Sequence, residues 1–352
     1  MSMQYSATPT FDPTDSQKTV HVGYKNHSNR NTQTRVRRNR LKFLLLFVVL
    51  LSFSLIAIQS FHGAFKWTRF KLPGFGIGRE CVYLPNDDSN AYGGLPSHYT
   101  LNSGDKIPSV ALGVWKAGRG EVGQAVKTAL ERGYRHIDGA WIYGNELEVG
   151  HALKESKVPR EEVWLTSKLW NTAHAPEDIE PALDDSLQKL GTNYLDLYLI
   201  HWPVAFSSGP EAYDADLTAN PYPTWKKLEE MVEKGKVRNI GVSNFNIQRM
   251  KNLTANPLKI LPAINQVEIN YFLPQPKLVE WSKQSGILLE AYSPLGSDKR
   301  VKESLNAPVV KEISEELGIT PAQVMISWHV QRGTIVLPKS VTPCRIVENW
   351  HG

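Results

Sequence analysis

The chain of 352 residues is long enough for one large domain or two ordinary ones, and 41% hydrophobic residues supply a sizeable core. Its formal net charge of +5 is partly local, because basic residues crowd the stretch 30–42. Elsewhere acidic and basic residues nearly balance, which argues against a nucleic-acid-binding face. The two cysteines, Cys81 and Cys344, match no metal-ligand spacing, so we expect no metal site.

The N-terminal region is unlike the rest of the chain. Residues 1–40 are rich in Ser, Thr, Asn, Gln and Arg without apolar periodicity, which predicts a disordered basic tail. Residues 43–58 contain only Ser52 and Ser54 as polar residues, and the run continues to about Ala64. This length can cross a bilayer, and it begins too far along the chain for a cleaved signal peptide. We therefore predict a transmembrane anchor over 41–64, a single-pass membrane protein, and a Gly- and Pro-rich linker over 65–98.

From residue 99 to 352 the pattern predicts one domain of alternating strands and helices. Segments 99–101 and 106–108 flank Asn-Ser-Gly-Asp and predict a hairpin that could plug the bottom of a barrel. Eight β-rich runs follow, at 110–114, 135–137, 163–166, 195–200, 237–242, 264–269, 287–291 and 334–337. Amphipathic stretches between them predict helices at 121–132, 146–155, 176–190, 223–234 and 307–317.

Chemically capable side chains recur at the carboxyl ends of these runs. They are Asp138, Lys168, His201, Ser243, Asn244, Gln266, Tyr292 and Lys339. Active sites of (β/α)8 barrels gather at that end, whereas a doubly wound sheet would show a glycine-rich phosphate turn after its first strand, and none is present. The sequence therefore predicts a (β/α)8 TIM barrel with its site at one rim.

Seven motifs follow one another in this domain. They are DGAWIYGNE (138–146), TSKLWN (166–171), LIHWP (199–203), GVSNF (241–245), NQVE (265–268), AYSPLG (291–296) and LPKSV (337–341). These motifs, over about 99–349, resemble the aldo-keto reductases in family order. The pattern is most similar to the fungal glycerol dehydrogenase and glyceraldehyde reductase type.

The resemblance implies a catalytic tetrad of Asp138, Tyr143, Lys168 and His201. A free tyrosine has a pKa near 10, and a nearby ammonium moves that pKa toward neutrality. Lys168 would supply the ammonium and Asp138 would keep it charged, so that Tyr143 exchanges a proton with the substrate oxygen. A neutral His201 would orient that oxygen. Alone, each residue has a structural explanation: a helix cap, a packed aromatic, a surface lysine or a structural histidine.

The resemblance also implies NADPH/NADP+ as cofactor. Ser243, Asn244 and Gln266 would bind the nicotinamide carboxamide, and Tyr292 would stack on the ring. Further cofactor contacts are implied for Ser293, Leu295 and Gly296 at the pyrophosphate, Lys339, Ser340 and Arg345 at the 2′-phosphate, and Glu348 and Asn349 at the adenine. Two cations and a hydroxyl suit a phosphate dianion, which favours NADPH over NADH.

The implied activity is reduction of aldehydes or ketones, or oxidation of polyols such as glycerol in reverse, by a monomeric catalytic domain. Trp115, Trp170 and Trp202 fall at pocket positions and would contact the small carbonyl or alcohol substrate. Basic residues before 41–64 outnumber those after it, which favours a cytosolic N-terminus. Because the cofactor is mostly cytosolic, the side of the membrane that holds the catalytic domain stays open.

Two other functions remain as alternatives. One is a catalytically weak NADPH-binding sensor or membrane-associated regulatory subunit, against which the intact tetrad argues. The other is a barrel lyase or isomerase with a Schiff base on Lys168, which would leave the cofactor motifs without a purpose. The chain ends 13 residues after Lys339, so the last barrel helix looks truncated. We expect poorly covered outer strands, lowered stability and relaxed specificity, unless both unusual ends reflect the gene model.

Overall fold

The fold is described from a computed structural model, which covers residues 94–207 and 213–351. The predicted tail over 1–40, the segment 41–64 and most of the linker over 65–98 lie outside these residues. Several short elements accompany the main fold: α5 (Ala215–Ala219), α9 (Ser297–Leu305), and the two-residue strands β7 (Ala205–Phe206) and β8 (Tyr213–Asp214).

The prediction of a single-pass membrane protein is corrected. Within 94–207 and 213–351, no helix combines the length and the apolar character needed to cross a bilayer. The proposed anchor, 41–64, falls outside the described residues.

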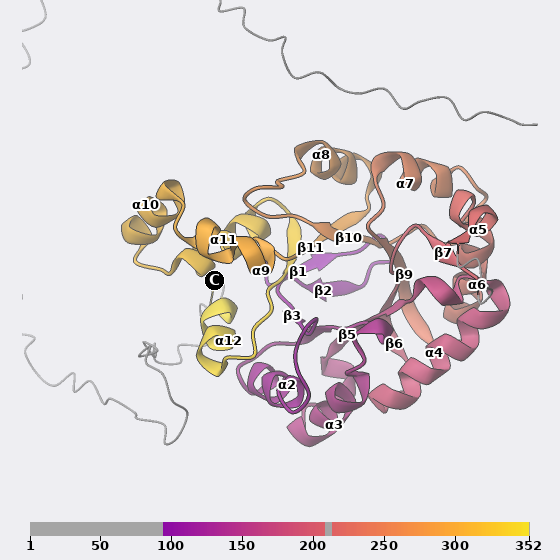
Figure 1. Cartoon of the computed structure of the whole chain (residues 1–352), viewed down its shortest axis with the longest axis horizontal. Helices are drawn as coiled ribbons and strands as arrows, with labels where there is room; N and C mark the ends of the chain where they lie inside the picture. The colour runs from indigo at the N-terminus through magenta and orange to yellow at the C-terminus, as the bar shows by residue number, and fades with distance from the viewer. Residues whose placement is uncertain (1–93, 208–212, 352) are drawn as a thin grey trace, which may run out of the picture. The chain divides into compact units, whose positions relative to one another are not determined.

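Eight parallel strands form the central sheet (Figure 1). In chain order they are β3 (Leu112–Gly113), β4 (His136–Asp138), β5 (Trp164–Leu169), β6 (Leu195–Ile200), β9 (Val237–Ser243), β10 (Ile264–Glu268), β11 (Leu288–Tyr292) and β12 (Thr334–Leu337). Each strand pairs with the next in that order. All eight overlap the runs predicted from the sequence, and most of their residues are buried, as expected for a parallel sheet covered on both faces.

The first and last strands of this sheet meet and close it. Val110 pairs with Val336 in a parallel bridge. The Ala111 amide donates to the Val336 carbonyl oxygen at 2.9 Å, and the Gly113 amide donates to the Pro338 carbonyl oxygen at 3.0 Å. The sheet is therefore a closed cylinder, consistent with a (β/α)8 barrel.

Helices surround the cylinder (Figure 1). They are α2 (Val122–Glu131), α3 (Glu146–Ser156), α4 (Pro176–Leu190), α6 (Tyr222–Glu233), α7 (Ile247–Thr254), α8 (Pro276–Ser285) and α11 (Pro321–Gln331), and α10 (Pro308–Leu317) packs against α11 farther from the strands. Helix α4 shows why such segments are helical: Pro176 occupies its first turn with two acidic residues, and Gly191 ends it in the left-handed conformation. Its buried residues Ile179, Leu183 and Leu187 recur every four positions and face the sheet.

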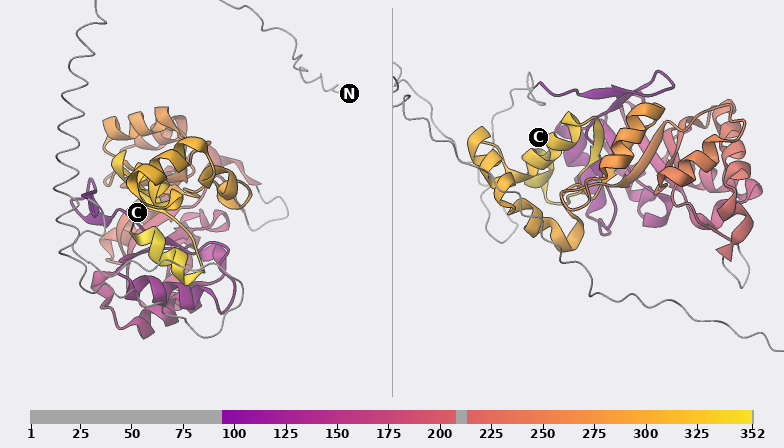
Figure 2. Two further views of the ribbon diagram at one scale, coloured as in Figure 1. Left: turned by 90° about the vertical axis from the view of Figure 1, so that its left-hand side faces the viewer. Right: turned by 90° about the horizontal axis from the view of Figure 1, so that it is seen from above.

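The predicted hairpin is present as β1 (His98–Thr100) and β2 (Lys106–Pro108), an antiparallel pair. It overlies one end of the cylinder in Figure 1 and lies along one edge of the barrel in the side view of Figure 2. The Tyr99 hydroxyl donates a hydrogen bond to the Val330 carbonyl oxygen at the end of α11. The hairpin is therefore attached to the helical layer as well as to the strands.

The C-terminal segment differs from the sequence expectation. Residues after β12 form α12 (Pro343–Trp350), which packs against α2 and α11. The rings of Tyr134 and Trp350 lie 4.6 Å apart, and the Tyr134 hydroxyl donates to the Ile346 carbonyl oxygen at 3.1 Å. The Ile346 side chain is fully buried. The outer strands β3 and β12 are thus buried, where we expected poor cover, whereas Val309, Leu317 and Trp328 of α10 and α11 are exposed.

The close approach of α3 and α4 depends on Gly150. A β-carbon there would lie 2.4 Å from the Lys189 carbonyl oxygen and 2.8 Å from the backbone of Leu190, so neither helix could keep its position. We predict that Gly150→Ala lowers the free energy of unfolding by about 1–3 kcal/mol or more, measured by urea denaturation. The matched control is Gly123→Ala on α2, whose β-carbon would meet only the flexible Glu148 side chain at 3.2 Å. Equal stability of the two variants would contradict this packing.

Candidate functional site

The four residues of the predicted tetrad meet at the carboxyl ends of the strands. Asp138 is the last residue of β4, and Tyr143 belongs to the short 3-10 helix Trp141–Tyr143 that follows. His201 comes directly after β6. Lys168 lies within β5 rather than after the third strand as expected, and it is fully buried. The barrel therefore brings together side chains that are separated by 63 positions along the chain.

The Lys168 ammonium is the centre of this cluster. Its Nζ atom donates to both carboxylate oxygens of Asp138 at 2.9 Å and to the Gly139 carbonyl oxygen at 2.7 Å. It lies 3.5 Å from the Tyr143 hydroxyl oxygen. Burial alone would lower the pKa of Lys168, but Asp138 and Tyr143 outweigh it and raise that pKa. Lys168 is therefore a permanent cation at neutral pH.

Tyr143 experiences two opposing effects. Burial raises the pKa of its hydroxyl, whereas the positive charge of Lys168 lowers it. Burial is the larger effect, so the net direction is upward. The sequence predicted that Lys168 lowers the pKa of Tyr143; it does so, but its effect is smaller than that of burial. Tyr143 is accordingly a phenol, able to donate a proton, at neutral pH.

His201 faces Tyr143 edge to face, with 5.8 Å between the ring centroids. The centroid of its ring also lies 5.3 Å from that of Trp170 and 6.5 Å from that of Trp202. Burial, and secondly the charge of Lys168, lower the pKa of His201 to about 3. The ring is therefore neutral at physiological pH, as the sequence analysis expected.

Ser243, Asn244, Gln266 and Tyr292 form a connected group beside the tetrad. The Tyr292 hydroxyl donates to Asn244 Oδ1 at 2.8 Å, and Asn244 Nδ2 donates to the His201 carbonyl oxygen at 2.9 Å and to Ser243 Oγ at 3.1 Å. Ser243 Oγ donates to the backbone carbonyl oxygen of Gln266 at 2.8 Å. Asn244 has a positive φ of 64°, which turns the chain after β9 toward the neighbouring strand.

The remaining predicted cofactor residues occupy two segments. Ser293, Leu295 and Gly296 form the turn after β11, where Ser293 and Gly296 have φ values of 49° and 103°. Lys339 and Arg345 are exposed, after β12 and in the first half of α12, near Ser340. Glu348 and Asn349 are in the last turn of α12, where Asn349 is buried and the Glu348 carbonyl accepts from Gln323 Nε2 at 3.2 Å. The roles assigned to these residues stay predictions.

Of the three predicted pocket tryptophans, two are notably exposed. Trp115 follows β3 with 49% of its surface exposed, and Trp202 follows His201 with 40% exposed. Trp170 is half-buried against His201. Trp141, in contrast, donates its indole N–H to Asp185 at 2.6 Å on α4 and is held there. Trp170 and Trp202 thus lie beside His201 of the tetrad.

Sequence reasoning missed two buried residues next to the tetrad. Glu290 on β11 is fully buried and shares the Gln266 amide group with Asp138. His136 on β4 lies with its Nε2 atom 3.8 Å from Glu290 Oε1. The available signal was Glu290 itself, a carboxyl within the otherwise apolar run LLEAY. Burial raises the pKa of Glu290 to about 8, with Asp138 as the second cause.

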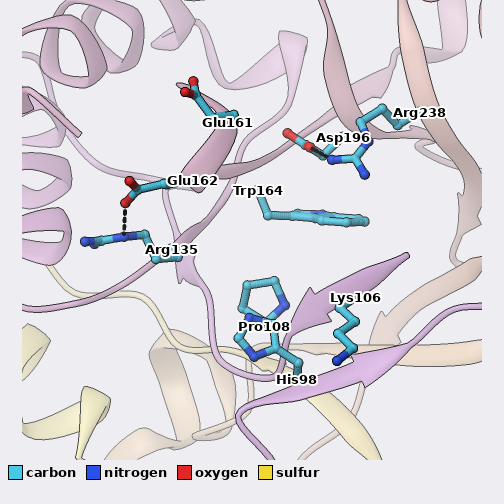
Figure 3. A pocket seen from close by; sticks show the side chains of 9 residues that line it. All are labelled: His98, Lys106, Pro108, Arg135, Glu161, Glu162, Trp164, Asp196 and Arg238. Carbon is cyan, nitrogen blue, oxygen red and sulfur yellow. Dashed lines mark hydrogen bonds and ion pairs between the residues drawn. The ribbon is translucent and has the colours of Figure 1, made fainter. Parts of the chain in front are cut away.

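A hollow of about 300 Å³ lies at the opposite end of the barrel (Figure 3). Trp164, Asp196 and Arg238, near the amino ends of β5, β6 and β9, line it together with Lys106 of the hairpin. None of the tetrad residues lines this hollow. In the part of the chain that the structure describes, no group of three or more metal-ligating residues is found. The cluster at the carboxyl ends is therefore the candidate active site.

Fold and cluster together define a class of protein: a (β/α)8-barrel enzyme with a buried lysine beside a phenol and a neutral imidazole. Comparison with known proteins then specifies the family. A model described as the aldo/keto reductase family matches residues 109–351. This chain belongs to the aldo/keto reductase family.

The regions that match individual relatives span most of the length of each relative. Glycerol 2-dehydrogenase (NADP(+)) of Saccharomyces cerevisiae is 47% identical over 266 residues, which are 71% of this chain and 84% of the yeast protein. Aldo-keto reductase family 1 member A1 of Homo sapiens is 46% identical over 267 residues, covering 71% and 82%. The solved structure of aldose reductase from Schistosoma japonicum has a TM-score of 0.67 at 42% identity, covering 72% of this chain and 85% of that one.

Burial of neutral histidines predicts acid sensitivity. Burial lowers the pKa of His136 and His174 to about 4, and that of His201 and His329 to about 3. These pKa values lie below the unfolded value of 6.5, so the stabilisation is present above pH 6.5 and is lost as pH falls toward 4. Glu290 and Glu146, whose pKa values are raised, oppose this loss but are fewer.

We predict that urea denaturation shows falling stability from pH 6.5 to 5, each histidine contributing up to about 1.4 kcal/mol per pH unit. His174→Gln should reduce the proton uptake on unfolding by about one. An unchanged pH slope in that variant would count against the burial argument.

Proposed function

We propose that this chain is an NADPH-dependent reductase of small aldehydes or ketones, with the segment 99–352 as its catalytic domain and Tyr143 as the general acid. In the reverse direction Tyr143 accepts the proton of an alcohol such as glycerol. The observation that carries the proposal is the Tyr143 hydroxyl next to the buried Lys168 ammonium, with the His201 ring edge to face with the phenol.

The bound nicotinamide supplies the hydride, and the residues of this chain handle the proton. As the substrate oxygen gains negative charge, Tyr143 transfers its hydroxyl proton to it, and Lys168 stabilises the phenolate that remains. Asp138 keeps the ammonium fixed, because it binds Nζ through both oxygens. The neutral His201 ring holds the substrate oxygen near Tyr143 without competing as a proton donor.

The hydrogen-bonding capacity left in the group of Ser243, Asn244 and Gln266 fits a carboxamide. All their side-chain donors are used within the protein: Ser243 on a carbonyl, Asn244 on His201 and Ser243, and Gln266 on Asp138 and Glu290. Unused acceptor positions remain on the three side-chain oxygens. An acceptor-rich group of this kind suits the NH2 of a nicotinamide carboxamide.

The segment after β12 supports a phosphate-bearing cofactor. Lys339 and Arg345 are exposed cations near the N-terminus of α12, where the positive end of the helix dipole favours an anion. The yeast relative is named as an NADP(+) enzyme. We infer from these features that the chain binds NADPH, with Lys339, Ser340 and Arg345 at its 2′-phosphate. Ser293, Leu295 and Gly296 would lie along the pyrophosphate, Glu348 and Asn349 near the adenine, and Tyr292 against the nicotinamide.

The substrate pocket is proposed between the rim tryptophans. Trp115, Trp170 and Trp202 flank the tetrad and offer apolar surface to the carbon skeleton of the substrate. The carbonyl oxygen would point at Tyr143 and His201. A small aldehyde or ketone satisfies both requirements.

The first test replaces the proposed acid. We expect Tyr143→Phe in the full chain to lower kcat for aldehyde reduction about 100- to 10,000-fold, with the Kd for NADPH within about twofold of wild type. The matched control is Tyr198→Phe, which removes a buried hydroxyl outside the site and should keep the wild-type rate. A Tyr143→Phe enzyme as fast as wild type would refute the assignment. NADPH binding without turnover by wild type would instead indicate a regulatory binding subunit.

The second test concerns cofactor choice. Arg345→Met should raise the Kd for NADPH about tenfold and leave that for NADH unchanged, because only NADPH carries the 2′-phosphate. Fluorescence titration measures both values. Lys311→Met, which removes an exposed cation on α10, serves as the control. Equal weakening of both cofactors would place Arg345 elsewhere.

A further inference from the structure

Glu290 is a buried carboxyl that the proposed chemistry does not use. It lies on β11, two residues before Tyr292, with no exposed surface. Its Oε2 atom accepts a hydrogen bond from Gln266 Nε2 at 2.8 Å, whereas its Oε1 atom has no hydrogen-bond partner. A carboxyl in such surroundings is costly unless it serves a purpose or stays neutral.

The amide of Gln266 connects Glu290 to the tetrad. Its Nε2 atom donates one hydrogen to Asp138 Oδ1 and the other to Glu290 Oε2, both at 2.8 Å. Since both neighbours offer acceptor oxygens, the side-chain NH2 group of Gln266 must face them and its side-chain oxygen, Oε1, must face away. Glu290 thus helps to fix which end of the Gln266 amide is presented to a ligand.

The charges of the cluster balance only when Glu290 is neutral. Asp138 pairs with Lys168 through both carboxylate oxygens. A second buried carboxylate would therefore have no counterion of its own. Burial, with Asp138 as the second cause, raises the pKa of Glu290 to about 8, so that the acid keeps its proton at neutral pH.

His136 is placed to face that proton. Its Nδ1 atom lies 3.3 Å from the Pro108 carbonyl oxygen, which can only accept, so Nδ1 carries the hydrogen. Its Nε2 atom then presents a lone pair to Thr166 Oγ1 at 3.3 Å and to Glu290 Oε1 at 3.8 Å. Burial lowers the pKa of His136 to about 4, so the ring is neutral.

The ionisable groups closest to the Glu290 cluster come from β4, from β5 and from the 3-10 helix Trp141–Tyr143. Strand β4 contributes Asp138 and His136, and β5 contributes Lys168. Of the two strands paired with β11, β10 provides the amide of Gln266 and carries the carboxyl of Glu268, which is paired with Tyr292 two residues beyond Glu290. The other, β12, reads TIVL and has no charge. Tyr143 follows beyond Lys168.

We propose that Glu290, in its protonated form, is a positioning residue that holds the Gln266 amide toward the cofactor and leaves Asp138 as the sole counterion of Lys168. This inference rests on the proposed function of the tetrad and of Gln266. When Glu290 loses its proton at alkaline pH, a second negative charge arises near Lys168. That charge raises the pKa of Tyr143 and disfavours the phenolate needed for alcohol oxidation.

The test compares Glu290→Gln with Glu290→Leu. Glutamine reproduces the neutral acid, because its carbonyl oxygen can accept from Gln266 while its NH2 faces His136 Nε2. At pH 6.5 we expect Glu290→Gln to keep kcat and the Kd for NADPH within about twofold of wild type. Leucine offers no acceptor, and it should raise the Kd for NADPH about tenfold and lower kcat.

The pH profile of alcohol oxidation is the decisive readout. Wild type should show an inflection near pH 8 that Glu290→Gln lacks. Glu146→Gln is the matched control: Glu146 is also buried, but it accepts from Ser167 and Ser186 and does not touch Gln266. This variant should keep the wild-type inflection.

An activity-free readout uses melting temperatures of the chain without cofactor. In the unfolded chain Glu290 titrates near 4.5 and in the folded protein near 8. Its contribution to stability is therefore greatest at low pH and falls as pH rises from 4.5 to 8. We expect the melting temperature of wild type, relative to Glu290→Gln, to fall across that window and to stay level above it.

Three results would overturn the proposal. They are an alkaline inflection that persists in Glu290→Gln, a change of more than about twofold in kcat or in the Kd for NADPH of Glu290→Gln at pH 6.5, and a melting-temperature difference that does not vary with pH. Should Glu290→Leu fail to fold, the glutamine comparison decides alone. If wild type binds NADPH without turnover, the proposed enzymatic function fails, while the melting temperatures and the Kd values still decide the role of Glu290.

Discussion

The structure depends on one buried ion pair, Lys168 with Asp138. An ammonium without water around it is stable only if oxygen atoms surround it, and three are supplied by Asp138 and the Gly139 carbonyl. Because these groups come from neighbouring strands, their geometry holds only while the cylinder is closed. The charge therefore links the fold to the chemistry: it lies beside the tyrosine hydroxyl, it adds to burial in keeping the histidine neutral, and it leaves no counterion for a second carboxylate.

Much of the fold followed from periodicity and burial. The runs at 195–200 and 334–337 agree with β6 and β12, and 176–190 agrees with α4, because each is a strongly apolar or strongly amphipathic segment with clear ends. Helices such as α8 and α11 were missed: their positions were left between strands without an amphipathic assignment. The place of the tetrad was predictable because its members follow strands, and parallel strands present their carboxyl ends to one rim.

Other features depend on contacts that no local pattern contains. Whether Glu290 would reach Gln266 or face a helix depends on which side of β11 turns inward, and both flanking residues are apolar. The balance between burial and Lys168 at Tyr143 likewise depends on the depth of the hydroxyl. At the C-terminus, family resemblance led us to expect poorly covered outer strands, but α12 packs against α2 and α11 there, with the Trp350 ring on Tyr134. The membrane prediction came from composition alone.

Closure of the cylinder also affects how the molecule meets its neighbours. The eight-stranded sheet has no first or last strand with free amides and carbonyls, since those of the segment around Val110 are used on Val336 and Pro338. An open sheet of this length would offer a template on which another chain could add a strand, and so a route to aggregation. Joining positions some 226 residues apart removes that template from the central sheet, but the join must wait until nearly the whole domain has been synthesised.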